Sequence, residues 1–132
     1  MKNVIATVFI GLGLLFAQIN LNAQTIYFCE GVNNDGYPVE SSHTFNISSD
    51  GGYLYVLVKL PYEVLCNSVR FEVNKNGYYE NTIYVDTETN WVWFWKKITF
   101  YKAGKYEFKV YDCFDLMLAS ATVNIKVNDY AF

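Results

Sequence analysis

The sequence predicts an all-β fold of seven or eight strands arranged as a two-sheet Greek-key sandwich. Three observations lead to this prediction. Between residues 24 and 132 no stretch of useful length has the 3.6-residue period of a helix. Apolar and polar residues alternate there instead, with valine, isoleucine, tyrosine and phenylalanine prominent. Short groups of turn-forming residues separate the alternating stretches, a spacing that is typical of β-sandwiches.

Seven alternating stretches are the expected strands. In chain order they are 43–48 (HTFNIS), 53–60 (YLYVLVKL), 68–74 (SVRFEVN), 82–86 (TIYVD), 91–101 (WVWFWKKITFY), 105–112 (KYEFKVYD) and 119–127 (ASATVNIKV). Turns are predicted at 49–52, 75–77 and 103–104, where glycine accompanies small or polar residues. Residues 24–42 start with a short apolar stretch and continue as GVNNDGYPVESS, so we expect an N-terminal extension made mostly of loop.

Residues 1–23 have the composition of a cleavable secretion signal. Lys2 gives a short positive start, an apolar run covers 4–16, and the small Ala23 precedes Gln24. The run is shorter than the roughly 20 apolar residues that span a bilayer, so no transmembrane anchor is expected after cleavage. The sequence therefore predicts a secreted protein of the periplasm, cell surface or exterior, with a single domain over 24–132.

Charge and motif content argue against several classes of function. The chain after residue 23 holds nine basic and thirteen acidic residues, whereas nucleic acids and anionic membranes select for clustered positive charge. His43 is the only histidine and lies at a predicted strand edge, and NNDG at 33–36 lacks the alternating acids of a calcium loop. Motifs for phosphate, dinucleotide, zinc or nucleophile chemistry are absent from the sequence. We therefore expect no enzyme activity, no metal and no cofactor, and no nucleic-acid partner.

The stretch FYKAGKYEFKVYD, residues 100–112, resembles the penultimate strand of bacterial immunoglobulin-like sandwiches of the PKD and fibronectin type III kind. An aromatic residue, a glycine-led turn, a tyrosine and alternating apolar residues carry the resemblance. It implies that Tyr106 is a corner residue whose hydroxyl holds the turn. It also implies that strands 43–48, 53–60, 91–101 and 82–86 share one sheet, while 68–74 and 105–112 are neighbours in the other. The aromatic-rich chain is also similar in style to small secreted proteins of the Bacteroidota.

Three cysteines in an oxidising compartment predict one disulfide and one remaining thiol. In the fold that the resemblance implies, the connections that hold Cys66 and Cys113 lie at the same end of the sandwich. Cys66–Cys113 is therefore the expected bridge. Cys29 precedes a strand that begins at that end, so it stays a competitor for either partner.

The stretch NWVWFWKK, residues 90–97, places three tryptophans at alternate positions of one strand. If Phe100 points inward and the strand is regular, the tryptophans point outward and Lys96 is buried. Because an unpaired buried lysine costs several kcal/mol, we expect a β-bulge at Lys96 and Lys97 instead. The bulge would turn the indoles into the core and Val92 and Phe94 outward.

With or without the bulge, the tryptophan strand and its neighbour have an apolar outer face. This face is the candidate contact surface. Its residues are Tyr53, Tyr55, Leu57, Trp91, Val92, Trp93, Phe94 and Trp95. Three coverings are compatible with it: the N-terminal extension, a protein partner or second copy, or a glycan that stacks on the aromatic rings. The sequence predicts a non-catalytic binding or structural component of the bacterial envelope or exterior with a protein partner. A carbohydrate-binding module is the alternative.

Overall fold

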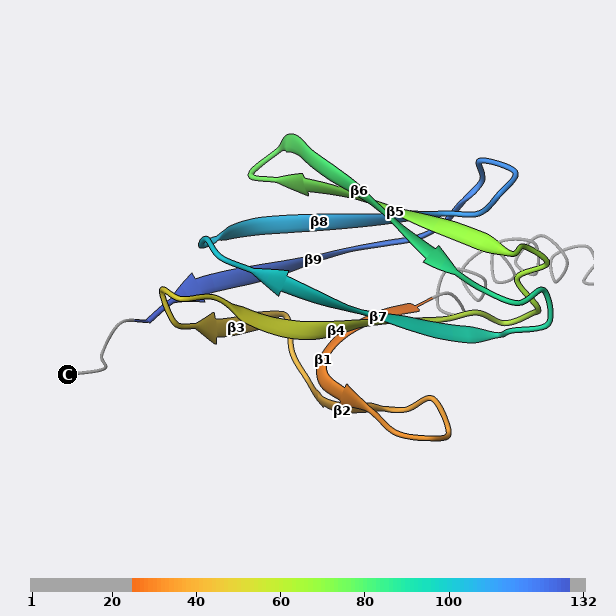
Figure 1. Cartoon of the computed structure of the whole chain (residues 1–132), viewed down its shortest axis with the longest axis horizontal. Helices are drawn as coiled ribbons and strands as arrows, with labels where there is room; N and C mark the ends of the chain where they lie inside the picture. The colour runs from red at the N-terminus through yellow and green to blue at the C-terminus, as the bar shows by residue number, and fades with distance from the viewer. Residues whose placement is uncertain (1–24, 129–132) are drawn as a thin grey trace, which may run out of the picture.

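The computed structural model describes residues 25–128, which form two β-sheets packed face to face (Figure 1). The predicted secretion signal at 1–23 lies outside the described residues. One sheet has the strand order β2-β1-β4-β7 and the other β3-β9-β8-β5-β6. The strands are β1 (Thr25–Val32), β2 (Pro38–Ser41), β3 (Thr44–Ile47), β4 (Gly52–Lys59), β5 (Ser68–Lys75), β6 (Tyr78–Asp86), β7 (Trp93–Phe100), β8 (Gly104–Tyr111) and β9 (Met117–Val127).

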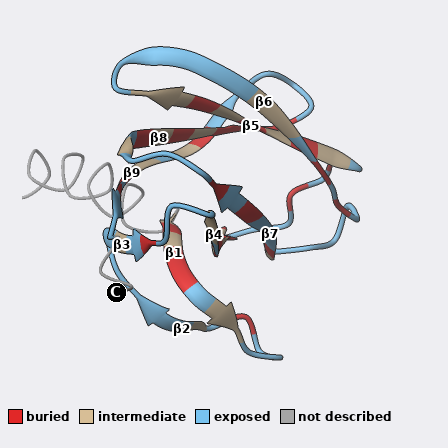
Figure 2. Ribbon diagram, turned by 60° about the vertical axis from the view of Figure 1, so that its left-hand side comes forward, coloured by how far each residue is buried: buried red, intermediate tan, exposed pale blue. Residues whose placement is uncertain are grey.

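The predicted all-β sandwich is confirmed, and its core is built from the alternation that predicted it. Along β5 and β8, buried residues alternate with partly exposed ones, while β2 and β6 are largely exposed (Figure 2). The rings of Phe28, Phe71 and Phe108 are fully buried, and the Phe108 ring lies 5.5 Å from that of Phe28 and 6.1 Å from that of Phe71. The edge-to-face contact of Phe28 with Phe108 joins the two sheets, and that of Phe71 with Phe108 links neighbouring strands of the five-stranded sheet.

The described residues contain nine strands because residues 25–41 form a hairpin where the sequence predicted mostly loop. β1 pairs antiparallel with β4, and its residues Ile26 and Phe28 enter the core. In the turn to β2, the Asn33 side-chain oxygen accepts hydrogen bonds from the backbone N–H groups of Asp35 and Tyr37. The loop prediction was wrong because the turn at 33–37 lets the flanking residues pair as a hairpin.

The sheet membership of two strands differs from the expected arrangement. β5 and β8 are neighbours, as predicted, but β6 pairs with β5 and β3 pairs in parallel with β9. Asn76 and Gly77 both have positive φ, 52° and 89°, as the two-residue turn of a tight hairpin requires. This turn holds β6 against β5, so β6 cannot join β7 in the other sheet.

The expected bulge in the tryptophan strand is wrong. β4 and β7 pair without interruption from Lys59↔Trp93 to Gly52↔Phe100. Trp93 and Trp95 therefore point outward, and Phe94, predicted to turn outward, is only 2% exposed in the core. Lys96 lies on the same side of β7 as the inward-pointing Phe94 and Ile98. It is nevertheless exposed, because β7 is the edge strand of its sheet. The desolvation cost that motivated the bulge does not arise at an open edge.

Tyr106 lies at the start of β8 and is nearly buried. Its hydroxyl donates a hydrogen bond of 2.9 Å to the carbonyl oxygen of Lys102, and its ring lies 4.8 Å from that of Phe100. The contact ties the β7–β8 turn to the core, which is the role that the resemblance implied for this residue.

The predicted disulfide between Cys66 and Cys113 is confirmed. It joins the β4–β5 connection to the segment after β8, with Cα atoms 5.8 Å apart. Cys29 is a free, buried thiol. Because disulfides persist in oxidising compartments, the bridge points to a location outside the cytoplasm.

Replacing Cys66 and Cys113 together by alanine should lower the free energy of unfolding by about 4 kcal/mol, since the bridge closes a long loop in the unfolded chain. Urea denaturation measures this loss. Cys29→Ala is the matched control for removing sulfur from a buried site. A double variant no less stable than this control would contradict the assigned role of the bridge.

Replacing Tyr106 by phenylalanine should cost about 1 kcal/mol at neutral pH through the lost hydrogen bond. Burial, followed by the charge of Glu80, raises the pKa of Tyr106 above its ordinary value of 10.0. The folded state thus holds this proton more tightly, so the hydroxyl's contribution is full below the unfolded pKa and disappears as pH rises through the folded pKa. Urea denaturation of both proteins should show their difference in stability shrinking as the pH rises above the ordinary value of 10.0. A difference in stability that stays constant with pH would contradict the assigned role of the Tyr106 hydroxyl.

Candidate functional site

The outer face of β4 and β7 carries a row of aromatic rings. The ring of Tyr55 lies 6.1 Å from Tyr53 and 5.2 Å from Trp95, in both cases edge to face. The ammonium of Lys97 lies 4.0 Å from the centre of the Tyr53 ring. Tyr53 and Trp95 are 57% and 46% exposed, so this part of the predicted contact surface is open to solvent.

The β1–β2 hairpin covers the other part of this face. A Cβ atom added to Gly36 would lie 2.5 Å from the indole of Trp93, so the turn rests directly on that ring. The Lys59 ammonium lies 4.0 Å from the centre of the Tyr37 ring. Leu57, predicted to be exposed on this face, is completely buried. The chain's own N-terminal segment thus covers part of the predicted surface and leaves Tyr53 and Trp95 open.

A first cavity, which we call the tryptophan cavity, lies where the β6–β7 connection enters β7. Its volume is about 490 Å³. It is lined by Asp86, Asn90, Trp91, Val92, Trp93, Phe94 and Trp95. Five of these seven residues belong to the contact surface predicted from the sequence. The other two add a carboxylate and an amide.

Backbone hydrogen bonds hold the tryptophan cavity in place. The N–H groups of Leu60 and Val64 donate to the carbonyl oxygens of Val92 and Trp91, both at 2.8 Å. The buried Thr87 hydroxyl donates to the carbonyl oxygen of Cys66, next to the disulfide. The cavity wall is therefore fixed to the β4–β5 connection.

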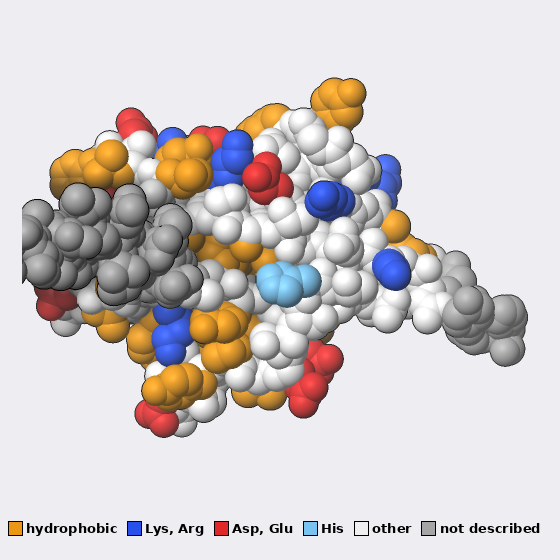
Figure 3. Space-filling model, turned by 180° about the vertical axis from the view of Figure 1, so that it is seen from behind, with side chains coloured by type: hydrophobic (Ala, Val, Ile, Leu, Met, Phe, Trp, Pro, Cys, Tyr) orange, Lys and Arg blue, Asp and Glu red, His pale blue; other side chains and the backbone are white. Residues whose placement is uncertain are grey.

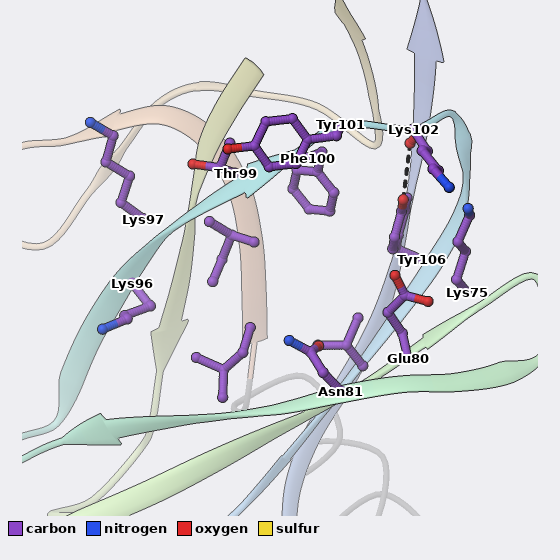
Figure 4. A pocket seen from close by; sticks show the side chains of 13 residues that line it. Lys75, Glu80, Asn81, Lys96, Lys97, Thr99, Phe100, Tyr101, Lys102 and Tyr106 are labelled. Carbon is purple, nitrogen blue, oxygen red and sulfur yellow. Dashed lines mark hydrogen bonds between the residues drawn. The ribbon is translucent and has the colours of Figure 1, made fainter. Parts of the chain in front are cut away.

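A second cavity, the lysine cavity, opens between the two sheets where the edge strands β6 and β7 face each other. Its volume is about 500 Å³. Val73, Ile83, Ile98 and Phe100 supply its apolar lining. Lys96 and Lys97 stand on one side and Lys75 and Lys102 on the other, with Glu80 and Asn81 between (Figure 4).

The two cavities meet on β7. Trp95 lines the tryptophan cavity, and the next residue, Lys96, lines the lysine cavity. β6 contributes to both as well, through Asp86 to the first and through Ile83 to the second. Both openings therefore lie along one edge of the sandwich.

Sequence reasoning missed Asp86, Asn90 and the four lysines. Asn90 stood in the quoted stretch NWVWFWKK, but a lone amide has no pattern of its own. The lysines come from β5, β7 and the β7–β8 turn, so only the tertiary fold brings them together. The Asn-Gly turn at 76–77 was the one signal that could have placed β6 on β5, and thereby opened the β7 edge.

The other candidates from the sequence have structural roles. His43 lies at the surface among uncharged atoms (Figure 3), with its Nδ1 3.3 Å from the carbonyl oxygen of Thr122. The amide of Asn33 in NNDG is engaged in the hairpin turn.

Residues 25–128 contain no group of three or more His, Cys, Asp or Glu side chains that could hold a metal ion. They also contain no helix of the length and hydropathy needed to cross a bilayer.

The Cys29 thiol is completely buried on β1. Burial raises the pKa of this thiol, while hydrogen bonds with the backbone of Val39 and Gly31 act in the opposite direction. Its sulfur lies 3.6 Å from the carbonyl oxygen of Tyr55. The residue thus lies buried within the sheet, paired with Ser41 of β2 and Tyr55 of β4.

No family model matches this chain, and no curated protein matches it.

Replacing Gly36 by alanine should loosen the hairpin from the tryptophan face, since the new Cβ would overlap the Trp93 indole. Gly36 has φ +82°, so the variant also carries a backbone cost of about 1–2 kcal/mol. Gly77→Ala is the matched control, because Gly77 has φ +89° and nothing within 4 Å of the added Cβ.

We expect Gly36→Ala to lose about 1–3 kcal/mol more than Gly77→Ala in urea denaturation, because overpacking adds to the backbone cost. Tryptophan fluorescence should shift to longer wavelength in Gly36→Ala alone as Trp93 is exposed. Equal losses with unchanged fluorescence would contradict the packing of the hairpin on Trp93.

Proposed function

We propose that this protein is a non-catalytic, secreted binding protein and that it binds carbohydrate at the tryptophan cavity. The observation that carries the proposal is the meeting of Trp91, Trp93 and Trp95 with Asp86 and Asn90 around one cavity. Sugars present apolar C–H faces and hydroxyl groups together, and they are bound by aromatic rings beside polar side chains.

Rigidity of the cavity supports this choice. Its wall is hydrogen-bonded to the β4–β5 connection and lies close to the disulfide. A preformed site avoids part of the ordering cost of binding, which matters for a ligand that gains little per contact.

A protein partner or a second copy of the chain is the second candidate. The exposed part of the aromatic row, with Tyr53 and Trp95, and the unpaired edge of β7 favour it. The hairpin reduces the apolar area that such a partner could bury, which is why we place this candidate second.

The cellular setting and the relationship to other sandwiches are proposals as well. The disulfide and the signal-like N-terminus support secretion to the periplasm, cell surface or exterior. The corner contact of Tyr106 supports an immunoglobulin-like relationship. Neither carries information on function by itself.

Affinity electrophoresis against a panel of neutral and acidic polysaccharides tests the proposed function. At least one polymer should retard the protein, and Trp91→Ala should weaken that binding by about tenfold or more, as expected for a central aromatic contact. Tyr84→Ala is the control, because this exposed aromatic lies outside both cavities.

Unretarded migration across the whole panel would overturn carbohydrate binding. If in addition the native protein sediments as an assembly that Tyr53→Arg dissociates, the second candidate takes its place. Retention that Trp91→Ala and Tyr84→Ala weaken equally would show that the cavity is not the site.

A further inference from the structure

The lysine cavity concentrates positive charge in an acidic protein. The chain has a formal net charge of −3, yet four of its ten basic residues line this one cavity. Lys96 and Lys97 lie on one side of the opening and Lys75 and Lys102 on the other, with the Lys97 ammonium over the Tyr53 ring, and Glu80 is the single carboxylate among the lining residues (Figure 4). The local charge thus has the opposite sign to that of the protein as a whole.

No ion pair neutralises the charge of these lysines within the described residues. In residues 25–128, the ion pairs are those of Arg70 with Glu72 and with Asp115. None of Lys75, Lys96 and Lys102 reaches a carboxylate, and Lys97 rests over the Tyr53 ring. Like charges brought together around one opening repel each other, and an anion placed there relieves the repulsion.

The lining between the lysines is not that of a site for a small inorganic anion. Ile98 and Phe100 of β7 face Val73 and Ile83 of the opposite sheet, and they form an apolar floor. Asn81 and Thr99 add hydrogen-bonding groups beside it. This combination suits a ligand with apolar faces, hydroxyl groups and negative charge together.

The lysine cavity lies next to the tryptophan cavity along β7, where the proposed carbohydrate site is. The two cavities meet between Trp95 and Lys96, and both lie on the same open edge of the sandwich. A chain of linked sugars that enters the tryptophan cavity can therefore continue into the lysine cavity.

From this arrangement we infer that the ligand is an acidic polysaccharide, whose sugars occupy the tryptophan cavity and whose negative groups lie among Lys75, Lys96, Lys97 and Lys102. The inference rests on the proposed carbohydrate binding and names the class of polymer that it requires. Glu80 opposes the ligand charge and sets a limit on the affinity.

Matched polymers separate this inference from the proposed function. Polygalacturonate carries carboxylates and dextran sulfate carries sulfates, and their neutral counterparts are fully methyl-esterified polygalacturonate and dextran. The full chain after the signal should be retarded by at least one acidic polymer about tenfold more strongly than by its neutral counterpart, and added salt should reduce the difference. Which acidic polymer is preferred identifies the charged group.

Charge variants locate the site. Lys96→Gln and Lys102→Gln should each weaken binding of the acidic polymer about two- to fivefold, and the double variant roughly tenfold. Glu80→Gln should strengthen it about two- to fivefold, a change that a loss of stability would not produce. Lys126→Gln, a change of the same charge at an exposed lysine outside both cavities, is the control and should bind as the wild type.

Four results would overturn the inference. If neutral and acidic polymers bind equally well and Trp91→Ala abolishes this binding, the preference for acidic polymers is wrong and carbohydrate binding stands. If no polymer binds, both proposals are wrong. Equal loss in Lys96→Gln and Lys126→Gln would show a response to net charge alone. Retention by polyglutamate as strong as by the acidic polysaccharides would show that charge, and not sugar, is recognised.

Discussion

The pairing of β6 with β5 is the constraint on which the rest of this structure depends. Asn76 and Gly77 adopt positive φ and close a tight hairpin, so β6 extends the five-stranded sheet. β7 therefore pairs only with β4 among the described strands and stands at the edge of its sheet. Both cavities exist because these two consecutive strands end on the same side of the sandwich without pairing.

An edge position also explains the composition of β7. A free edge invites pairing with other chains, and charged side chains on it are a common protection. Lys96 and Lys97 stand in the middle of β7 and are exposed there. The same two lysines contribute to the rim of a cavity, so under the proposed binding one feature protects the edge and supplies the charge for a ligand.

The aromatic face combines self-coverage with exposure. Gly36 lets the hairpin approach the Trp93 indole, and Leu57, on the central strand β4, is completely buried. Tyr53 and Trp95 stay open at the far end of the row.

The sequence alone determined the all-β class, the positions of seven of the nine described strands and the concentration of aromatic residues, because alternation and turn chemistry are local signals. The Cys66–Cys113 bridge was expected only from the fold that the resemblance implied, with Cys29 as a competitor. Tertiary structure decided which strands became edges, and with them the register of β7 and the burial of Phe94. The bulge was predicted from the cost of burying Lys96, and that cost depends on what flanks the strand. Strand neighbours are set by long-range pairing, which no window of sequence contains, so the cavity formed by Asp86, Asn90 and the tryptophans became visible only in the folded chain.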